Sequence, residues 1–435
     1  MFRGEGNAPP SGRVSPRSSA LAPFRIRSFQ LQWPADLFTA WAFEMETLIL
    51  GWYILAETGS VFMLTLFGAL QYLGTLIAPM LGVAGDRAGH RNVLAAMRGA
   101  YTVLAASLLL LSLAGQLQPL VVLVLAMLNG LVRPSDQGMR AALMAETMPP
   151  AHLIPAASIS RTTTDSARIA GALLGAGLFA AAGMTVAYVA VTTIYAIGLV
   201  LTLCIPRVPR AANVAHGEAS VTALVQRPSP WRDLREGIAY IWRTPHLLAC
   251  MWLACLVNLS AFPLTGGLLP YVARDIYHTH QTGLGYMAAS FAGGALCGSI
   301  LMSLAGGRMR PARMMLIFGA GWYAALLVFA QTSTLVPGLF ALFLTGLVQS
   351  FSMVPLTVLL LRTAGDRFRG RVMGVRMMAI YTLPLGLLAA GALTSRIGFT
   401  ATATLYAVSG IVCVALIAAL WRKHLWPLDA PGNDL

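Results

Sequence analysis

Charge is scarce in this chain, and lysine is almost missing. Only 11% of the 435 residues are Asp, Glu, Lys or Arg, and Lys423 is the sole lysine. Soluble domains carry about a quarter charged residues, so this composition, with 57% hydrophobic residues and a mean hydropathy of +0.70, predicts a protein built for lipid. The net charge of +14 comes almost entirely from arginine. A basic nucleic-acid binder would carry more charge overall, so we expect no nucleic-acid partner.

Patterns of catalytic and metal-binding residues are also missing. The seven histidines lie in predicted tails, in loops or at the ends of apolar segments, and no HExxH is present. His278 and His280 form a close pair, but two histidines rarely suffice to hold a metal. The nucleotide-binding pattern GxxxxGK[ST] does not occur, which excludes ATP as the fuel. We therefore expect no enzyme activity, no metal and no cofactor. The five cysteines are scattered without disulfide or metal spacing: Cys204, Cys250, Cys255, Cys297 and Cys413.

A secretory signal is missing as well. Residues 1–30 are rich in Ser, Pro, Gly and Arg and lack the apolar core and cleavage site of such a signal. This composition predicts a disordered, positively charged tail. Residues 423–435 form a second polar tail.

Long apolar segments fill most of the remaining chain. A membrane-spanning helix needs about 20 mostly apolar residues. The sequence therefore predicts an all-α integral membrane protein with twelve transmembrane helices. They lie at about 35–56, 61–83, 93–114, 119–146, 154–181, 184–205, 247–273, 281–305, 313–331, 336–363, 371–394 and 399–421.

One long polar connection, residues 206–246, divides these segments into two sets of six. We therefore expect an N-terminal six-helix bundle over residues 31–205 and a C-terminal bundle over 247–422, related by pseudo-symmetry. Within the connection, apolar residues recur at helical spacing and predict an amphipathic helix on the membrane surface. These residues are Trp231, Leu234, Ile238 and Ile241.

The arginines are concentrated on one side of the predicted spans. The turns "AETGS", "GQLQP", "AAGMT" and "QTSTLVP" on the other side contain no Lys or Arg, and only Arg274 and Arg396 fall there. The positive-inside bias then predicts that both termini lie in the cytoplasm. An even number of spans agrees with this. We expect a multi-pass protein of the bacterial cytoplasmic (inner) membrane.

Two arginine-rich loops look alike, "GDRAGHR" at 85–91 and "GDRFRGR" at 365–371. Two halves of six helices imply an offset of about 220 residues between matching positions. That offset matches residue 85 with "GGRMRPAR" at 306–313 instead. In this second pair Gly307 stands where Asp86 stands in the first, so one half lacks the acid.

The loop "GVAGDRAGHRN" resembles the loop signature of the major facilitator superfamily at Gly82, Asp86, Arg87, Gly89 and Arg91. The segments "PFRIRSFQLQW", "LILGWYILAETGS", "LLPYVARDIY" and "RGRVMGVRMMAIYTLPLG" look like the branch that contains enterobactin-type siderophore exporters and macrolide efflux pumps. The resemblance implies the major facilitator fold and transport of a small molecule by rocking of two bundles.

In the resembled family this loop acts as a conformational latch that joins the halves when the central cavity faces outward. Physically, Asp86 can accept hydrogen bonds from a helix N-terminus, and Arg87 can pair with carboxylates or helix carboxyl ends. We assign Arg140 and Arg161 to the same latch. The alternative is a plain positive-inside anchor.

Ionisable residues at membrane depth are costly, so each one suggests a function. Glu44 and Glu46 lie near the middle of the first predicted span and, two residues apart, point to different faces. A carboxylate that faces a central cavity can carry a proton. We predict proton coupling through Glu44, Glu46 and Asp165. Neutral, hydrogen-bonded packing is the alternative for the two glutamates.

The fourth and fifth predicted spans each carry an arginine–acid–arginine stripe on one helical face. Such faces cannot point toward lipid. In a structural interpretation, each acid pairs with its flanking arginines. In a functional one, the excess positive charge attracts an anionic ligand, since a guanidinium binds carboxylate or phosphate bidentately. The stripes are Arg133, Asp136 and Arg140, then Arg161, Asp165 and Arg168.

The deepest of these arginines, Arg133 and Arg168, are predicted to contact the substrate. Three amide side chains within the spans complete the predicted substrate-binding set: Asn129, Asn258 and Gln349. The second half is otherwise nearly uncharged at depth. A charged wall opposite an apolar one suits a bulky amphipathic solute.

The function expected from these features is secondary active transport by alternating access, with the substrate bound between the halves. Proton-coupled efflux of a small amphiphilic or anionic compound, such as a siderophore or drug, is the preferred hypothesis, with the proton motive force as the energy source. Uptake or facilitated transport of a small organic anion is one alternative. A transport-fold protein without proton coupling is another, because Ala172 stands where antiporters of the superfamily often carry proline. The expected partners are the substrate and the bilayer, and we expect a monomer.

Overall fold

The computed structural model describes five stretches of the chain, and every regular element in them is a helix. These stretches are residues 22–75, 78–206, 230–305, 310–365 and 368–426.

Six spans form the N-terminal bundle. They comprise α1 (Arg27–Thr58), α2 (Val61–Leu70) with η2 (Leu73–Thr75) and α3 (Ala78–Ala88), α4 (His90–Leu113), α5 (Pro119–Thr147) and the double-length α6 (Pro150–Cys204). α6 contains two spans that meet at Gly183, where a φ of 77° breaks the helix. This left-handed backbone favours glycine, which has no Cβ to clash.

The second six spans form the C-terminal bundle. The seventh begins with α9 (Pro245–Leu256) and continues through the wide π-helical turns η4 (Val257–Ala261), η5 (Pro263–Gly267) and η6 (Val272–Ile276). The short α10 (Leu269–Tyr271) lies between η5 and η6. Pro263 and Pro270 lack the N–H that a regular helix requires, which fits this loosened winding. The other spans are α11 (Gln281–Ala305), α12 (Pro311–Ala330), α13 (Leu335–Thr363), α14 (Arg369–Met378) with η8 (Ala379–Tyr381) and α15 (Thr382–Ile397), and α16 (Phe399–Leu420).

Nine helices among the described residues are long and apolar enough to cross a membrane. One of them, Pro155–Cys204, holds two spans because of the break at Gly183. α1, whose central glutamates lower its hydropathy, and the broken span from α2 to α3 complete the set. The predicted all-α architecture of twelve spans is confirmed.

Glycine contacts show that the two bundles are built alike. A Cβ on Gly74 would lie 2.0 Å from the carbonyl oxygen of Leu131, so the second and fourth spans pack backbone to backbone. A Cβ on Gly346 would lie 2.0 Å from the carbonyl oxygen of Phe291, so the eighth and tenth spans do the same. Gly130 and Gly294 occupy the partner positions. The pairs are about 220 residues apart, the offset expected for a repeat of six spans.

The ends of the bundles differ. At one end, named the basic end here, lie the start of α1, the α3–α4 turn, the linker helix α8 (Pro230–Arg243) and α17 (Arg422–Leu425). The far end carries the turns at Gly59, Gly115 and Gly398, each with positive φ. Whether the basic end faces the cytoplasm stays a prediction.

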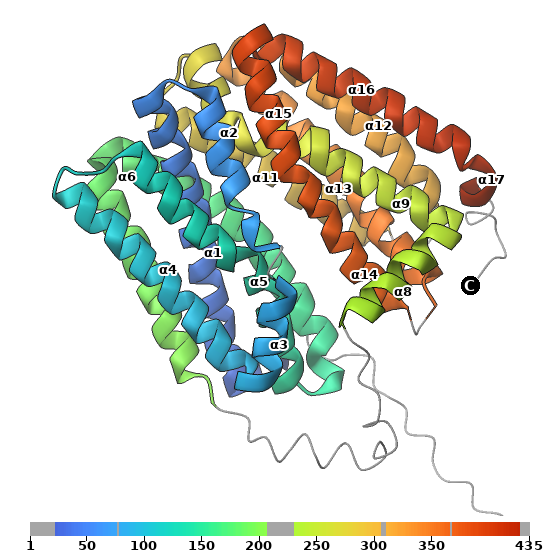
Figure 1. The fold of residues 1–435 in the computed structure, drawn as a ribbon, viewed down its shortest axis with the longest axis horizontal. Coiled ribbons are helices and arrows are strands. Elements are labelled where there is room, and N and C mark those ends of the chain that lie inside the picture. The colour runs from blue at the N-terminus through green and yellow to red at the C-terminus, as the bar shows by residue number, and fades with distance from the viewer. Residues whose placement is uncertain (1–21, 76–77, 207–229, 306–309, 366–367, 427–435) are drawn as a thin grey trace, which may run out of the picture.

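The two bundles meet toward the far end. α2 packs against α15 and α6 packs against α11, and Figure 1 shows α2 and α15 side by side. α3 and α14 continue the same two spans toward the basic end, and their described residues do not pack closely on each other. The bundles are therefore splayed toward the basic end.

Hydrogen bonds between described residues also join the bundles directly. Arg274 Nη1 donates to the carbonyl oxygen of Leu55 over 2.5 Å near the far end. The Tyr381 hydroxyl donates to the carbonyl oxygen of Thr75 over 2.6 Å. This second bond lies where η2 and η8 interrupt their spans, so the break in one bundle is tied to the break in the other.

The linker helix α8 rests on the C-terminal bundle. Arg371 of α14 donates to Glu236 over 2.8 Å, and Tyr240 stacks on Phe368 with ring centroids 4.4 Å apart. The predicted helix is present. The residues of its apolar stripe differ in burial, since Ile241 is buried and Ile238 is 41% exposed. The side chains of Trp231 and Leu234 lie outside the described set.

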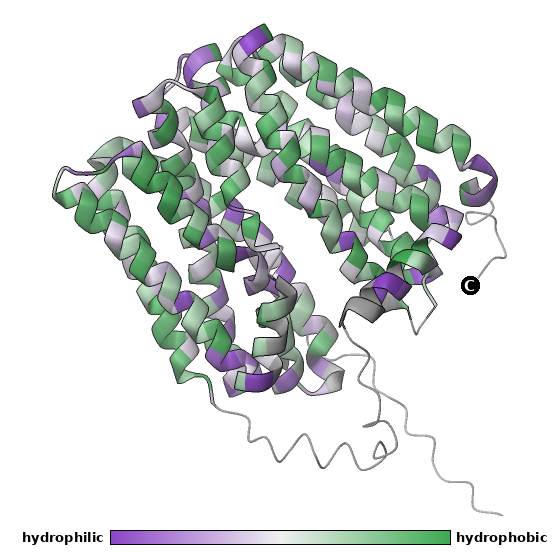
Figure 2. Ribbon diagram, viewed as in Figure 1, coloured by the Kyte–Doolittle hydropathy of each residue, from purple (hydrophilic) through white to green (hydrophobic). Residues whose placement is uncertain are grey.

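The outer surface of both bundles is apolar. Figure 2 shows hydrophobic residues along the outward faces of α4 and α16, including Val103, Leu110, Leu416 and Leu420, each at least 53% exposed. A surface this apolar is suited to lipid.

Candidate functional site

Polar groups at depth gather in the N-terminal bundle. All four charged side chains that are buried in the described structure belong to it: Asp36, Glu46, Arg98 and Asp136. The buried polar side chains of the C-terminal bundle are hydroxyls of serine and threonine, such as Ser260 and Thr345. Among the described residues, the fully buried charged side chains therefore lie in the N-terminal half.

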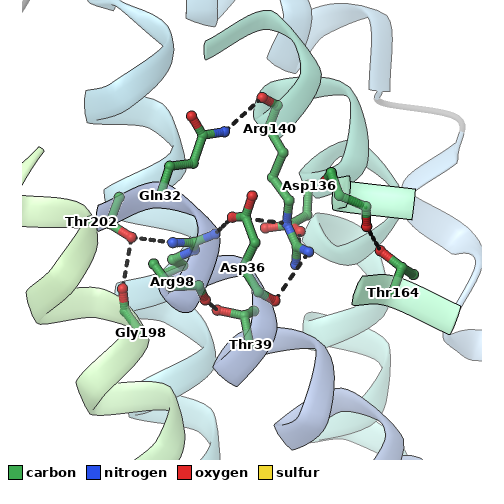
Figure 3. Close-up of polar contacts among 11 residues, drawn as sticks. Gln32, Asp36, Thr39, Arg98, Asp136, Arg140, Thr164, Gly198 and Thr202 are labelled. Carbon is green, nitrogen blue, oxygen red and sulfur yellow. Dashed lines mark hydrogen bonds and ion pairs between the residues drawn. The ribbon is translucent and has the colours of Figure 1, made fainter. Parts of the chain in front are cut away.

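A first cluster, the charge network, joins α1, α4 and α5 (Figure 3). Arg98 donates to the Asp36 carboxylate and to the Thr202 hydroxyl. Arg140 pairs with Asp136 and also lies 3.6 Å from Asp36. No side chain among the two acids and two arginines exceeds 13% exposure. Their formal charges cancel, which is how charge is kept at depth.

Sequence reasoning missed Asp36 and Arg98 as members of a site. Each is an isolated ionisable residue within an apolar segment, and such a residue needs a partner at depth. An unpaired acid in the first span and an unpaired arginine in the third could therefore have been predicted to pair with each other. Their meeting depends on the packing of α1 beside α4, which no spacing along the chain reveals.

A second cluster, the glutamate cluster, lies deeper. Asn129 Nδ2 donates to Glu46 Oε2 over 2.9 Å, and the Tyr195 hydroxyl donates to the same oxygen over 2.7 Å. Glu46 is 5% exposed and Asn129 8%. Two donors on one oxygen provide the hydrogen bonds that a buried carboxyl group requires.

Arg133 sits beside this cluster. It donates to the hydroxyl of Thr47 over 2.9 Å and to the side-chain oxygen of Gln71, and its guanidinium lies 4.7 Å from the centre of the Phe43 ring. It is close enough to Glu46 to act on it electrostatically. These contacts direct Arg133 toward the protein rather than leave its donors open for a ligand.

A third group is more exposed. Arg168 Nε lies 3.6 Å from Glu44 Oε1, with side chains 43% and 31% exposed. Arg161, 74% exposed, pairs with Asp165 over 3.3 Å. The pairing expected within each stripe is thus present for Asp136 with Arg140 and for Arg161 with Asp165. It is wrong for Arg133, which bonds to Thr47 and Gln71, and for Arg168, which turns to α1. Glu44 and Glu46 do occupy different environments.

The two predicted ligands on the C-terminal bundle lie apart from these clusters. Asn258 donates to the carbonyl oxygen of Ala254 over 2.8 Å, one helical turn away. Gln349 Oε1 is buried and has no hydrogen-bond partner in the described structure. Their assignment to the substrate site stays a prediction.

The contacts described for Arg91 and His90 in the predicted latch lie within the N-terminal bundle. Gly89, with φ of 87°, precedes α4, and Arg91 donates to the carbonyl oxygen of Leu203 and to Asn92. His90 Nδ1 lies 2.6 Å from Glu146 Oε1. Arg87 is exposed at the end of α3. These partners agree with bundles that are splayed at the basic end.

Other members of the predicted latch are placed differently. Arg140 belongs to the buried charge network, and Arg161 pairs on its own helix. Gly82 lies within α3. The side chain of Asp86 and the matching residue Gly307 fall outside the described set.

Family comparison identifies the fold that these clusters occupy. The model of the Major Facilitator Superfamily matches residues 33–382 and, in a second match, residues 251–433. The chain belongs to the major facilitator superfamily. It is therefore a multi-pass membrane transporter and not an enzyme, as the sequence predicted.

The similar proteins of known function include efflux proteins. The chain is 23% identical to Macrolide efflux protein A of Streptococcus pyogenes over 413 residues, which cover 89% of this chain and 96% of that protein. It is 29% identical to the Multidrug efflux pump Tap of Mycobacterium tuberculosis over 208 residues, 46% of this chain and 48% of that protein. The resemblance to the efflux branch is confirmed.

Solved structures share the fold. A D-xylose-proton symporter matches with a TM-score of 0.67 and 11% identity, covering 92% of this chain and 97% of its own. A bacterial homologue of the human lysosomal transporter Spinster, in an inward-facing conformation, matches with a TM-score of 0.66 and 12% identity over 93% and 99% of the two chains.

Proposed function

We propose that this transporter exports a small amphiphilic compound in exchange for protons. Alternating access of the two bundles provides the mechanism, with substrate bound between them. Two observations support the proposal. The relatives of known function named above are efflux proteins, and the N-terminal bundle holds a carboxyl group, Glu46, in a protein interior where gain or loss of a proton has a large electrostatic effect.

Glu46 is the proposed proton carrier and carries the argument. Its partners Asn129 and Tyr195 lie on α5 and α6, so a change of charge on Glu46 alters bonds that hold three helices together. Arg133 stabilises the ionised form from the side. Protonation weakens these bonds, and the bundle can then adopt its other conformation. Asp165, ion-paired with Arg161 on an exposed face, is the second candidate.

The proposed substrate contact is the exposed pair of Arg168 and Glu44. Arg168 can bind a carboxylate or phosphate, and Glu44 can bind an amine, so the pair suits either an anionic compound such as a siderophore or a drug that carries an amine. Asn258 and Gln349 are the proposed contacts from the opposite bundle. Arg133 is reassigned from the substrate to the support of Glu46, and Glu44 from proton coupling to the substrate.

The proposed location is the bacterial cytoplasmic membrane, with both termini in the cytoplasm and the transporter acting as a monomer. The basic end then faces the cytoplasm, where the positive-inside bias places it. The splayed conformation is the one that would load a compound for export.

The test uses purified protein in liposomes with an imposed pH gradient and a labelled macrolide as the first probe. Wild-type protein is expected to move the probe against its gradient and to stop when an uncoupler is added. Glu46→Gln should abolish the uphill movement and retain exchange of probe across the membrane. Glu44→Gln should instead weaken binding of the probe and leave coupling intact. Uphill transport by Glu46→Gln equal to wild type would remove Glu46 as the carrier.

Facilitated transport of a small organic anion is the second candidate, favoured by the part-exposed guanidinium of Arg168, which can bind a carboxylate or phosphate. Under this alternative, movement of an anionic siderophore would follow its own gradient and would survive the uncoupler. Uphill, uncoupler-sensitive transport would exclude it.

A further inference from the structure

Unpartnered polar atoms line the interior of the N-terminal bundle. Several buried atoms there have no hydrogen-bond partner among the described residues: Gln32 Oε1, Tyr101 Oη, Asn129 Oδ1, Ser135 Oγ and Asp136 Oδ1. Each such atom costs about 1–3 kcal/mol if nothing satisfies it. Buried water, which makes about three hydrogen bonds, is the usual solution in protein interiors.

These atoms occur at successive depths. On α5, Asn129 touches Glu46, and Ser135 and Asp136 follow about 10 Å farther toward the basic end, by the rise of 1.5 Å per residue. On α1, Asp36 and then Gln32 follow Glu46 in the same direction. The polar atoms therefore extend from the glutamate cluster to the charge network.

Tyr101 lies between the two clusters. Its side chain is fully buried, and its ring lies 5.8 Å from the ring of Tyr195, the residue that donates to Glu46. Its hydroxyl is in electrostatic range of Asp136 and Arg140 in the charge network. A hydroxyl both donates and accepts, so this residue can pass a proton on.

We propose that Glu46 exchanges its proton with the basic end through the interior of the N-terminal bundle, by a water-filled relay that includes Tyr195, Tyr101 and Asp136. The substrate path between the bundles is then separate from the proton path. This inference rests on the proposed proton coupling.

The relay moves one proton and leaves its members unchanged. The Glu46 carboxyl gives its proton to the Tyr195 hydroxyl oxygen as that hydroxyl releases its own proton to water. Water and the Tyr101 hydroxyl repeat the exchange, and Asp136 Oδ1 accepts the proton before water at the basic end removes it. Arg140, the most exposed member of the network at 13%, marks the exit.

The charged and titratable groups around the relay come from three helices, α4, α5 and α6. Around Glu46 they are Arg133, Tyr188 and Tyr195. Around Tyr101 they are Arg98, Arg133, Asp136, Arg140 and Tyr195. The arginines balance the acids and disfavour a lasting excess proton, which suits a path of transit.

The test follows the carboxyl band of Glu46 by time-resolved infrared spectroscopy after a jump from acidic to neutral pH, with full-length protein in liposomes and no substrate. The band is identified by its loss in Glu46→Gln. In Tyr101→Phe, deprotonation of Glu46 should slow about tenfold or more, equivalent to a barrier raised by about 1.4 kcal/mol. The Tyr101 hydroxyl has no hydrogen-bond partner among the described residues, so its removal breaks none of the hydrogen bonds described.

Tyr323→Phe is the matched control, because Tyr323 is equally buried but lies in the C-terminal bundle and bonds to Ser260. It should leave the rate unchanged. If Glu46 loses its proton in Tyr101→Phe as fast as in wild type, the relay is wrong. That result would not affect the proposal that Glu46 carries the proton. If Glu46→Gln removes no band, Glu46 does not titrate, and both the relay and the proposed carrier are wrong.

Discussion

Asp36 and Arg98 illustrate how single residues hold charge inside the bilayer. Each belongs to a network of two acids and two arginines, so removal of one member leaves an uncompensated charge of known sign. Loss of Arg98 leaves one negative charge, and loss of Asp36 leaves one positive charge. Removal of both leaves the neutral pair of Asp136 and Arg140.

Charge balance in this network predicts a suppressor. Arg98→Met should destabilise the protein by about 3–5 kcal/mol, the cost of breaking a buried ion pair from one side. Combination with Asp36→Asn should restore most of the loss. Thermal unfolding in detergent, read as the midpoint temperature of each variant, measures this. If the double variant is less stable than either single variant, charge balance is not what stabilises the protein at this network.

For single residues, the sequence predicted which charged side chains lie at membrane depth better than it predicted which side chains they pair with. Spacing along one helix indicates which side chains share a face, and it identified Asp136 with Arg140. It could not indicate that Arg168 turns to Glu44 on another helix, because that choice depends on how close α1 and α6 pack. Gly171 and Gly175 permit that approach: a Cβ on either would lie 2.8 Å from an atom of α1.

At the scale of elements, close glycine contacts set the distances between spans. The second span crosses the fourth where Gly74 and Gly130 face each other's backbone. The second span also loses its regular winding there, at η2. The sequence predicted one continuous span over 61–83, since its hydropathy carries no sign of a break that tertiary packing imposes.

Gly74→Ala should destabilise the N-terminal bundle by about 1–3 kcal/mol, because the new methyl meets backbone that cannot give way. Gly138→Ala on α5 is the control, since a Cβ there meets nothing within 4 Å. It should be neutral or slightly stabilising, as alanine favours helix more than glycine does. Expression level and thermal midpoint of the two variants distinguish them. Equal losses would show that contact distance at Gly74 is not critical.

For the whole molecule, the sequence predicted the span number and the repeat offset but not which end is open. Hydropathy and internal similarity report properties that both conformations share. The open end depends on contacts such as Arg274 with Leu55, which exist in one conformation and are small beside the total packing energy.

Arg274→Ala should shift the protein toward the conformation that is open at the far end. A hydrogen bond from a charged donor contributes about 1.5–3 kcal/mol, so the ratio of conformations should change at least about tenfold. Spin labels at Ala145 on α5 and Arg362 on α13 would report a shorter distance at the basic end. Arg396→Ala, which removes an exposed arginine at the far end, is the control. An unchanged distance distribution would show that Arg274 does not hold the bundles together.

The unequal division of charge between the bundles also bears on how the chain is made. α1 leaves the ribosome first, yet it carries Asp36, Glu44 and Glu46 and is too polar to count among the spans that composition alone identifies. A single aspartate at the centre of a span opposes insertion by about 2.5–3.5 kcal/mol. We therefore expect stable insertion of α1 to depend on α4 and α5, which supply Arg98, Asn129 and Arg133 as partners of its acids. The last span, α16, contains no charged residue and needs no such help.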